Sequence, residues 1–146
     1  VLEFKSIPGA PAPDDTPQRR LLQMRTIAKR FTATQNSGNN KAELQLLPQP
    51  VDRYTPSPVD RADGAMFLFT LGGTNPEVAM LLESDGKEWK FGGGRLSAGH
   101  PIVISIDGET AWEIPLHKYG FHEPYTAANA PAEIPGIAAD GSDIKE

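Results

Sequence analysis

The residues best suited to metal chemistry lie near the C-terminal end of the chain, in the segment HKYGFHEPY. His117, His122 and Glu123 offer two imidazoles and a carboxylate, which are ligand types that zinc accepts. Zinc motifs on helices place two histidines one turn apart, whereas these two are further apart and Gly120 lies between them. A strand would place them on opposite faces of a sheet. We therefore expect no metal site.

A second candidate is the glycine run at residues 92–94 followed by Arg95, which resembles a phosphate-binding loop in its glycine content. Such loops lead directly into a helix whose N-terminus binds the phosphate. The residues after Arg95 lead instead to another β-prone run, so we expect a bulge or a wide loop. Glu83, Trp89 and Arg95 are the residues of an alternative small-ligand or hydrolase site near this loop.

Other catalytic chemistry finds little support in the sequence. The chain has no cysteine, which excludes a disulfide, a thiolate zinc site and a cysteine nucleophile. No Gly-x-Ser-x-Gly motif is present for a serine nucleophile. Asp60 and Asp63 lack the alternating acid spacing of a calcium loop. The interpretation therefore leans away from an enzyme, and we expect no cofactor.

Charge is distributed unevenly along the 146 residues. The net charge is −5, and residues 1–16 and 124–146 together carry all of it, at −2 and −3. Between them, one stretch without an acid holds Arg19, Arg20, Arg25, Lys29 and Arg30. Nucleic-acid-binding domains are usually basic, whereas the isoelectric point here is near 5.2. We expect the basic stretch to meet acidic protein segments rather than nucleic acid.

These basic residues lie on a predicted helix. Thr16 is a typical N-cap, and Pro17 suits the first helical position. Apolar residues at three- and four-residue spacing then predict a buried stripe of Leu21, Met24, Ile27, Ala28 and Phe31. The opposite arc would carry Arg19, Arg25, Lys29 and Arg30. The run QNSGNN at residues 35–40 is expected to end the helix.

From residue 43 onward, short β-prone runs alternate with turns. Residues 65–71 are apolar on both faces, which predicts a central strand, and residues 78–83 are its expected neighbour. Asp85-Gly86 and Asp107-Gly108 favour tight type I′ hairpins. The last hairpin should share one apolar face among Ile102, Ile104, Ile106, Trp112 and Ile114. The sequence thus predicts an α+β domain at residues 17–123, with one N-terminal amphipathic helix packed on a twisted antiparallel meander of five or six strands.

The two ends differ in composition from this domain. Residues 1–16 contain the proline-rich run IPGAPAPDD, and residues 124–146 are rich in Ala, Pro and Gly, so both are expected to be extended arms. We expect these acidic arms to dock on neighbouring copies of the chain or on another protein, with the basic helix face as one receiving surface. The expected interaction residues are Leu2, Phe4, Arg19, Arg25, Lys29, Arg30, Ile134 and Ile137.

The runs LQLLPQPVDRY at residues 44–54 and DGAMFLFTLGGTNPEVAMLLE at residues 63–83, with Trp89 and Arg95 downstream, resemble an uncharacterised family of predicted exported proteins of planctomycete bacteria. The resemblance leaves both arms outside. It implies an extracytoplasmic protein, with Val1 as a mature N-terminus after removal of a leader. It implies no activity, cofactor or catalytic residue.

No apolar run is long enough to span a membrane, so we expect no membrane insertion. The sequence as a whole favours a non-enzymatic structural or interaction protein that assembles with itself or with another protein. A small-ligand-binding protein or hydrolase is the alternative.

Overall fold

The computed structural model describes residues 3–97 and 100–116, and within them one helix and nine strands are present. The α+β class is as expected. In chain order the elements are β1 (Lys5–Ser6), α1 (Pro17–Ala28), β2 (Phe31–Ser37), β3 (Asn40–Leu46), β4 (Asp52–Tyr54), β5 (Ala62–Leu71), β6 (Asn75–Asp85), β7 (Trp89–Arg95), β8 (Ile102–Ile106) and β9 (Glu109–Ile114).

The helix begins where the sequence predicts and ends earlier. The Thr16 hydroxyl accepts a hydrogen bond from the Arg19 amide at 3.3 Å, which makes Thr16 the N-cap. The helix ends at Ala28, and Phe31 opens β2, so the expectation of a longer helix was wrong. Phe31 is buried as expected, but it faces the core from a strand whose residues alternate between buried and exposed. Gly38, at φ 60°, then forms the β2–β3 turn instead of a helix end.

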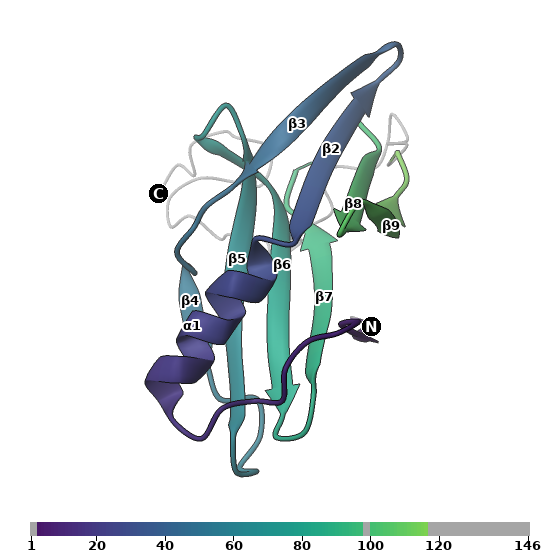
Figure 1. Cartoon of the computed structure of the whole chain (residues 1–146). Helices are drawn as coiled ribbons and strands as arrows, with labels where there is room; N and C mark the ends of the chain where they lie inside the picture. Colours follow the sequence, from purple (N-terminus) through teal and green to yellow (C-terminus); the bar gives the residue numbers. More distant parts are fainter. Residues whose placement is uncertain (1–2, 98–99, 117–146) are drawn as a thin grey trace, which may run out of the picture.

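The sheet is larger than five or six strands and is not a simple meander. Its order is β1-β7-β6-β5-β3-β2-β8-β9, with β4 paired to β5 beside the end of β3, and all pairs are antiparallel. The meander expectation holds for β5, β6 and β7. It fails at β8, which pairs with β2 rather than with β7. Helix α1 lies over one face of the sheet against β5, and the β2–β3 hairpin projects past the end of that face (Figure 1).

The sheet curls so that its two ends approach each other over one core. The rings of Phe31 on β2 and Phe91 on β7 meet edge to face, with centroids 5.0 Å apart. A Cβ on Gly93 would lie 2.9 Å from the ring of Trp112 on β9, so only glycine leaves room for that tryptophan. The expected apolar face of the last hairpin is confirmed, since Ile102, Ile104 and Ile106 are buried.

Of the turn and loop predictions, those for residues 92–94 and for Asp85-Gly86 need correction, and the one for Asp107-Gly108 does not. Residues 92–94 form no bulge or wide loop; they lie in register inside β7, and close neighbours leave no room for a Cβ at Gly92 and Gly93. Asp107 and Gly108 both have positive φ and form the expected tight hairpin. The Asp85-Gly86 turn is wider, because the Asp85 carboxylate accepts hydrogen bonds from the amides of Lys87 and Glu88 and closes a longer connection.

The N-terminal segment runs along its own domain instead of away from it (Figure 1). Residues 5 and 6 pair with β7 as β1, and Ile7 joins the core. The expected C-terminal arm, residues 124–146, lies outside the described residues.

Candidate functional site

A groove of about 640 Å³, the arm–helix groove, lies between the N-terminal segment and α1. The N-terminal segment contributes Gly9, Pro11 and Asp14 to its lining, and α1 contributes Arg19, Leu22 and Thr26, among others. The exposed surface of the groove is mainly apolar, and its charged lining residues are Arg19, Arg30 and the acid Asp14. Its size falls within the range of about 300–1,000 Å³ that is common for ligand sites.

The outer wall of this groove is held by hydrogen bonds to α1. Gln23 donates its side-chain amide to the carbonyl of Ala12 at 2.8 Å and accepts the amide of Asp14 at 2.9 Å. Further along, Arg30 donates to the carbonyl of Pro8 at 2.5 Å. The amide of Ile7 donates to the carbonyl of Trp89 at 3.1 Å, which ties the wall to β7. The groove is thus a built feature with two fixed sides.

A buried charge cluster at the start of α1 ties the helix to the sheet. Arg20 donates to Asp63 on β5 at 2.8 Å, and Arg53 donates to the same carboxylate at 2.7 Å. Arg20 also donates to the carbonyls of Asp14 and Asp15, and Arg53 donates to that of Pro17. Burial raises the pKa of Asp63, but hydrogen bonds from Arg53 and Arg20 outweigh it and hold that pKa below its usual value. These bonds fix the helix against the sheet.

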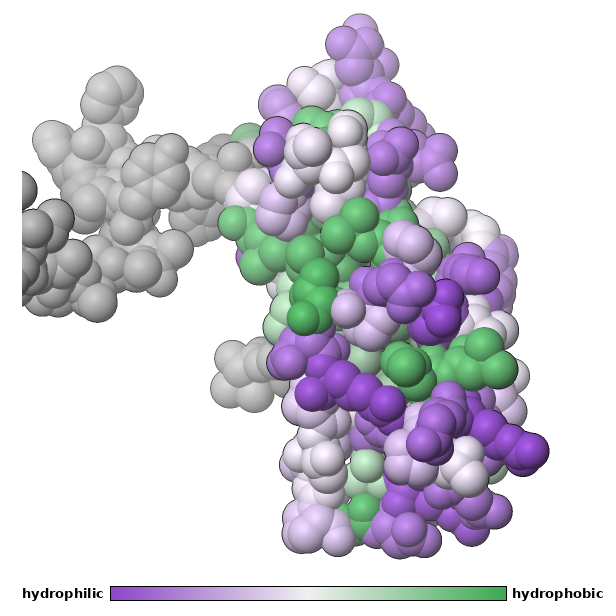
Figure 2. Space-filling model, turned by 90° about the vertical axis from the view of Figure 1, so that its left-hand side faces the viewer, coloured by the Kyte–Doolittle hydropathy of each residue, from purple (hydrophilic) through white to green (hydrophobic). Residues whose placement is uncertain are grey.

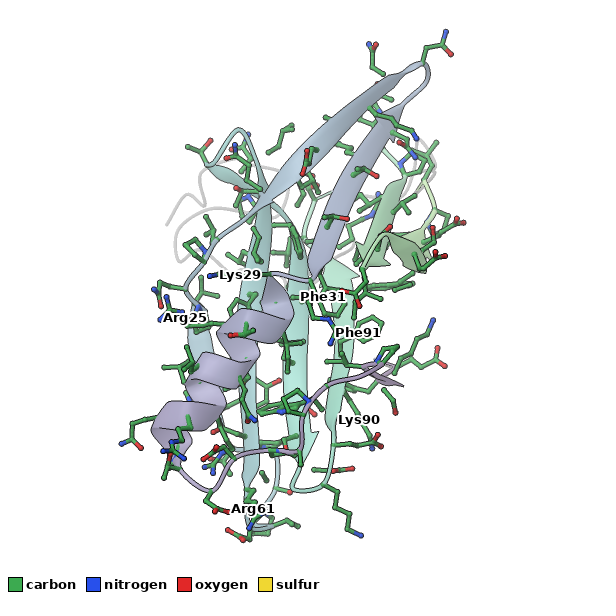
Figure 3. All side chains as sticks on the ribbon, viewed as in Figure 1. Arg25, Lys29, Phe31, Arg61, Lys90 and Phe91 are labelled. Carbon is green, nitrogen blue, oxygen red and sulfur yellow. The ribbon has the colours of Figure 1, made fainter. Side chains whose placement is uncertain are left out.

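The outer face of α1, which we define as Arg19, Leu22, Arg25, Thr26 and Lys29, borders the groove. Leu22 lies at the centre of this face and is 61% exposed. Arg19 and Arg25 lie three residues to either side of it, and residues at this spacing are neighbours on a helix. Arg25 and Lys29 leave the same flank of α1 (Figure 3). This face therefore presents one apolar side chain between basic ones.

The four basic residues that were expected to contact a partner differ in the ion pairs that they form within the chain. Arg30 forms an ion pair with Asp107 at 2.6 Å, and Arg19 lies 3.9 Å from Asp14 of the N-terminal segment. Hydrogen bonding from Arg30 lowers the pKa of Asp107. Within the described part of the chain, Arg25 and Lys29 form no ion pair, and the Nε atom of Arg25 is buried without a hydrogen-bond partner. The unpaired charge is concentrated at the C-terminal half of the outer face.

The expected apolar contacts are placed differently. Phe4 packs its ring over Gly92 of β7, 3.3 Å from where a Cβ would stand, and so contacts its own domain. Leu2, Ile134 and Ile137 lie outside the described residues. Leu22 was missed by the sequence analysis, although its position between Arg19 and Arg25 on the arc opposite the apolar stripe was the available signal.

The alternative set of Glu83, Trp89 and Arg95 does not converge on one site. Glu83 and Trp89 occupy adjacent rows of the β6–β7 ladder, so their side chains point to opposite faces of the sheet. Trp89 is buried in the core, and Glu83 accepts a hydrogen bond from the Tyr54 hydroxyl at 2.8 Å. Arg95 pairs with Val78, about 16 Å along β6 from Glu83. Its guanidinium donates to the carbonyls of His100 and Pro115.

A smaller hollow of about 340 Å³ lies beside Glu83, with Phe4 and Lys90 in its lining. Its charged groups are already bonded to each other. Lys90 donates to Asp85 at 2.9 Å and lies 3.5 Å from Glu88. Burial, with the hydrogen bond to Glu83, raises the pKa of the Tyr54 hydroxyl, so that this group stays a neutral donor. A ligand here would have to displace formed bonds, which makes this hollow a weaker candidate than the groove.

A comparison with protein families, with curated proteins and with solved structures finds no match to this chain. Across residues 3–97 and 100–116, no group of three or more His, Asp or Glu side chains is arranged to hold a metal ion. His117, His122 and Glu123 lie outside that part. Within it, no helix is long and apolar enough to cross a membrane. The groove and the outer face of α1 are therefore the site that the described residues support best.

Proposed function

We propose that this protein is a non-enzymatic interaction protein that binds an extended acidic protein segment through the arm–helix groove and the outer face of α1. The observation that carries the proposal is the exposed Leu22, set between basic side chains on a helix whose other flank is fully packed. Interfaces commonly combine an apolar centre with a polar rim, and complementary charge guides the approach of partners.

The distribution of apolar surface supports a small, mixed contact. On the side drawn in Figure 2, hydrophobic surface is divided into patches by hydrophilic side chains. A large permanent interface would need a wider continuous apolar area. A linear segment with a few apolar anchors fits such a surface better than a globular face does.

The proposed partner includes other copies of the chain, so the protein forms a homo-oligomer or a polymer. The opposite charges of the basic outer face and the acidic C-terminal residues support this proposal. The resemblance to exported planctomycete proteins extends the proposal to an extracytoplasmic setting.

Sedimentation velocity of the full chain over a range of concentrations tests the proposal. Leu22→Asp should weaken self-association about tenfold or more, because it places a negative charge where an apolar, acidic segment binds. Val59→Asp is the matched control, since Val59 is 55% exposed and lies outside the groove. A chain that is monomeric at every concentration, or one in which the two substitutions act equally, would contradict the proposal.

The alternative of a small-ligand site or hydrolase at Glu83, Trp89 and Arg95 has less support, because the three side chains do not share a cavity.

A further inference from the structure

The groove limits the chemistry of its occupant. Its lining joins Pro11 and Leu22, which favour apolar side chains, to the charged pair of Arg19 and Asp14. Arg25 and Lys29 add basic groups on the outer face of α1, outside the lining of the groove. An occupant that uses both parts should carry a short apolar stretch followed or preceded by carboxylates.

The N-terminal segment is not free to be this occupant. Phe4 covers Gly92, Ile7 is part of the core, and Gln23 bonds Ala12 and Asp14. These contacts make the segment one wall of the groove of its own chain. Of the two acidic arms, the C-terminal one therefore remains as a ligand.

We infer that residues 131–146 of a second copy of the chain occupy the arm–helix groove, an inference that rests on the proposed function. This segment reads PAEIPGIAADGSDIKE. It combines the apolar residues Ile134, Ile137 and Ile144 with four acids against one lysine. Its apolar residues match the lining of the groove, and its acids match the unpaired Arg25 and Lys29.

The spacing of the segment fits an extended mode of binding. Pro135 favours polyproline II backbone, in which residues three apart lie on the same side about 9 Å from each other. Ile134 and Ile137 have that separation, and Asp140 and Asp143 continue it. From Ile134 to Asp143 the segment would span about 28 Å, enough to pass the whole of α1, which is about 18 Å long.

The self-association proposed above makes a second copy the source of the segment. Each copy then offers one groove and one segment, so the contact is head to tail and gives rings or filaments.

The experiment measures the anisotropy of a fluorescein-labelled peptide with the sequence of residues 128–146. The receptor is the full chain carrying Ile134→Ser and Ile137→Ser, which removes competition from its own segment. We expect saturable binding, weakened about tenfold by Leu22→Asp in the receptor and hardly changed by Val59→Asp. A peptide of the same composition with its isoleucines and acids rearranged is the matched control ligand.

Equal binding of the rearranged peptide, or no binding of the native one, would overturn the inference. If the full chain nevertheless associates with itself and Leu22→Asp prevents it, the proposed function stands and only the occupant is wrong. If neither peptide binds and the full chain is monomeric, the proposed function fails as well. A further outcome is that the peptide binds the receptor with Ile134→Ser and Ile137→Ser while the wild-type chain stays monomeric. The segment would then occupy the groove of its own copy, which contradicts a second copy as its source.

Discussion

The inner and outer flanks of α1 carry similar side chains that differ in burial and in bonding. On the inner flank, Arg20 is buried and bonded to Asp63 and to two backbone carbonyls, beside the fully packed Met24 and Ile27. On the outer flank, Arg25 lies next to the exposed Leu22 and keeps a buried Nε atom without a partner. An arginine five residues from another on one helix thus stabilises the fold in the first case and forms no ion pair among the described residues in the second.

The difference comes from what the rest of the chain supplies to each flank. Asp63 on β5 and Arg53 on β4 reach the inner flank and satisfy its charges, with the Asp63 side chain only 7% exposed. Among the described residues no acid reaches Arg25 or Lys29. We therefore expect substitutions on the inner flank to change the free energy of unfolding, and substitutions on the outer flank to change association.

The largest effect should follow from Asp63→Asn. The substitution leaves two guanidinium groups, one of them buried, without their carboxylate, and removal of one partner from a buried ion pair typically costs about 3–5 kcal/mol. Urea denaturation followed by circular dichroism measures the loss. Asp60→Asn is the control, because the Asp60 side chain is 94% exposed, and it should change the free energy of unfolding by less than about 0.5 kcal/mol. A loss as small as that of the control would show that the cluster does not hold α1 to the sheet.

Part of the fold could be predicted from the sequence. Thr16 and Pro17 predicted the start of α1, residues 65–71 and 78–83 predicted the β5–β6 pair, and the alternating isoleucines predicted the buried face of β8. In each case the signal is local, since capping, alternation and turn chemistry depend on residues a few positions apart.

The features that the sequence analysis failed to predict depend on residues far apart in the chain. Phe31 continues the helical spacing of Met24 and Ile27, yet it lies in a strand because β8 pairs with it from across the fold. Arg20 also has the spacing of the buried stripe, four residues before Met24, but only its partner 43 residues away makes burial of its charge tolerable. The groove was equally hidden, because its outer wall is a proline-rich segment whose composition resembles that of a free arm.

A smaller effect is expected in the pH dependence of the free energy of unfolding, which tests the role of Asp63 on the inner flank of α1. The pKa of Asp63 is lower in the folded chain than in the unfolded chain, so its contribution to stability is complete above the unfolded pKa and is lost as the pH falls through the folded one. The free energy of unfolding should therefore fall on acidification below about pH 4. Asp85 and Asp107, whose pKa values are also lowered by bonded cations, contribute in the same direction.

The control for this pH dependence is the Asp63→Asn variant, which lacks the titrating carboxyl next to Arg20 and Arg53. Its free energy of unfolding should fall less steeply than that of the wild type between pH 5 and pH 2, as measured by urea denaturation at each pH. Identical slopes for the two proteins would mean that Asp63 keeps its ordinary pKa in the fold.

The smallest effect on folding, and the one most specific to function, is expected for the double substitution Arg25→Ala and Lys29→Ala. Neither side chain forms an ion pair within the described residues, so the free energy of unfolding should change by less than about 0.5 kcal/mol. Self-association should nevertheless weaken by about three- to tenfold in low salt, because exposed charge pairs contribute up to about 1 kcal/mol each and are screened by ions. Lys41→Ala with Lys87→Ala is the matched control, since both lysines are exposed and the change in net charge is the same. Sedimentation velocity at two salt concentrations compares the variants. If both pairs weaken association equally, the effect belongs to the net charge of the chain, and the outer flank of α1 has no special role in recognition.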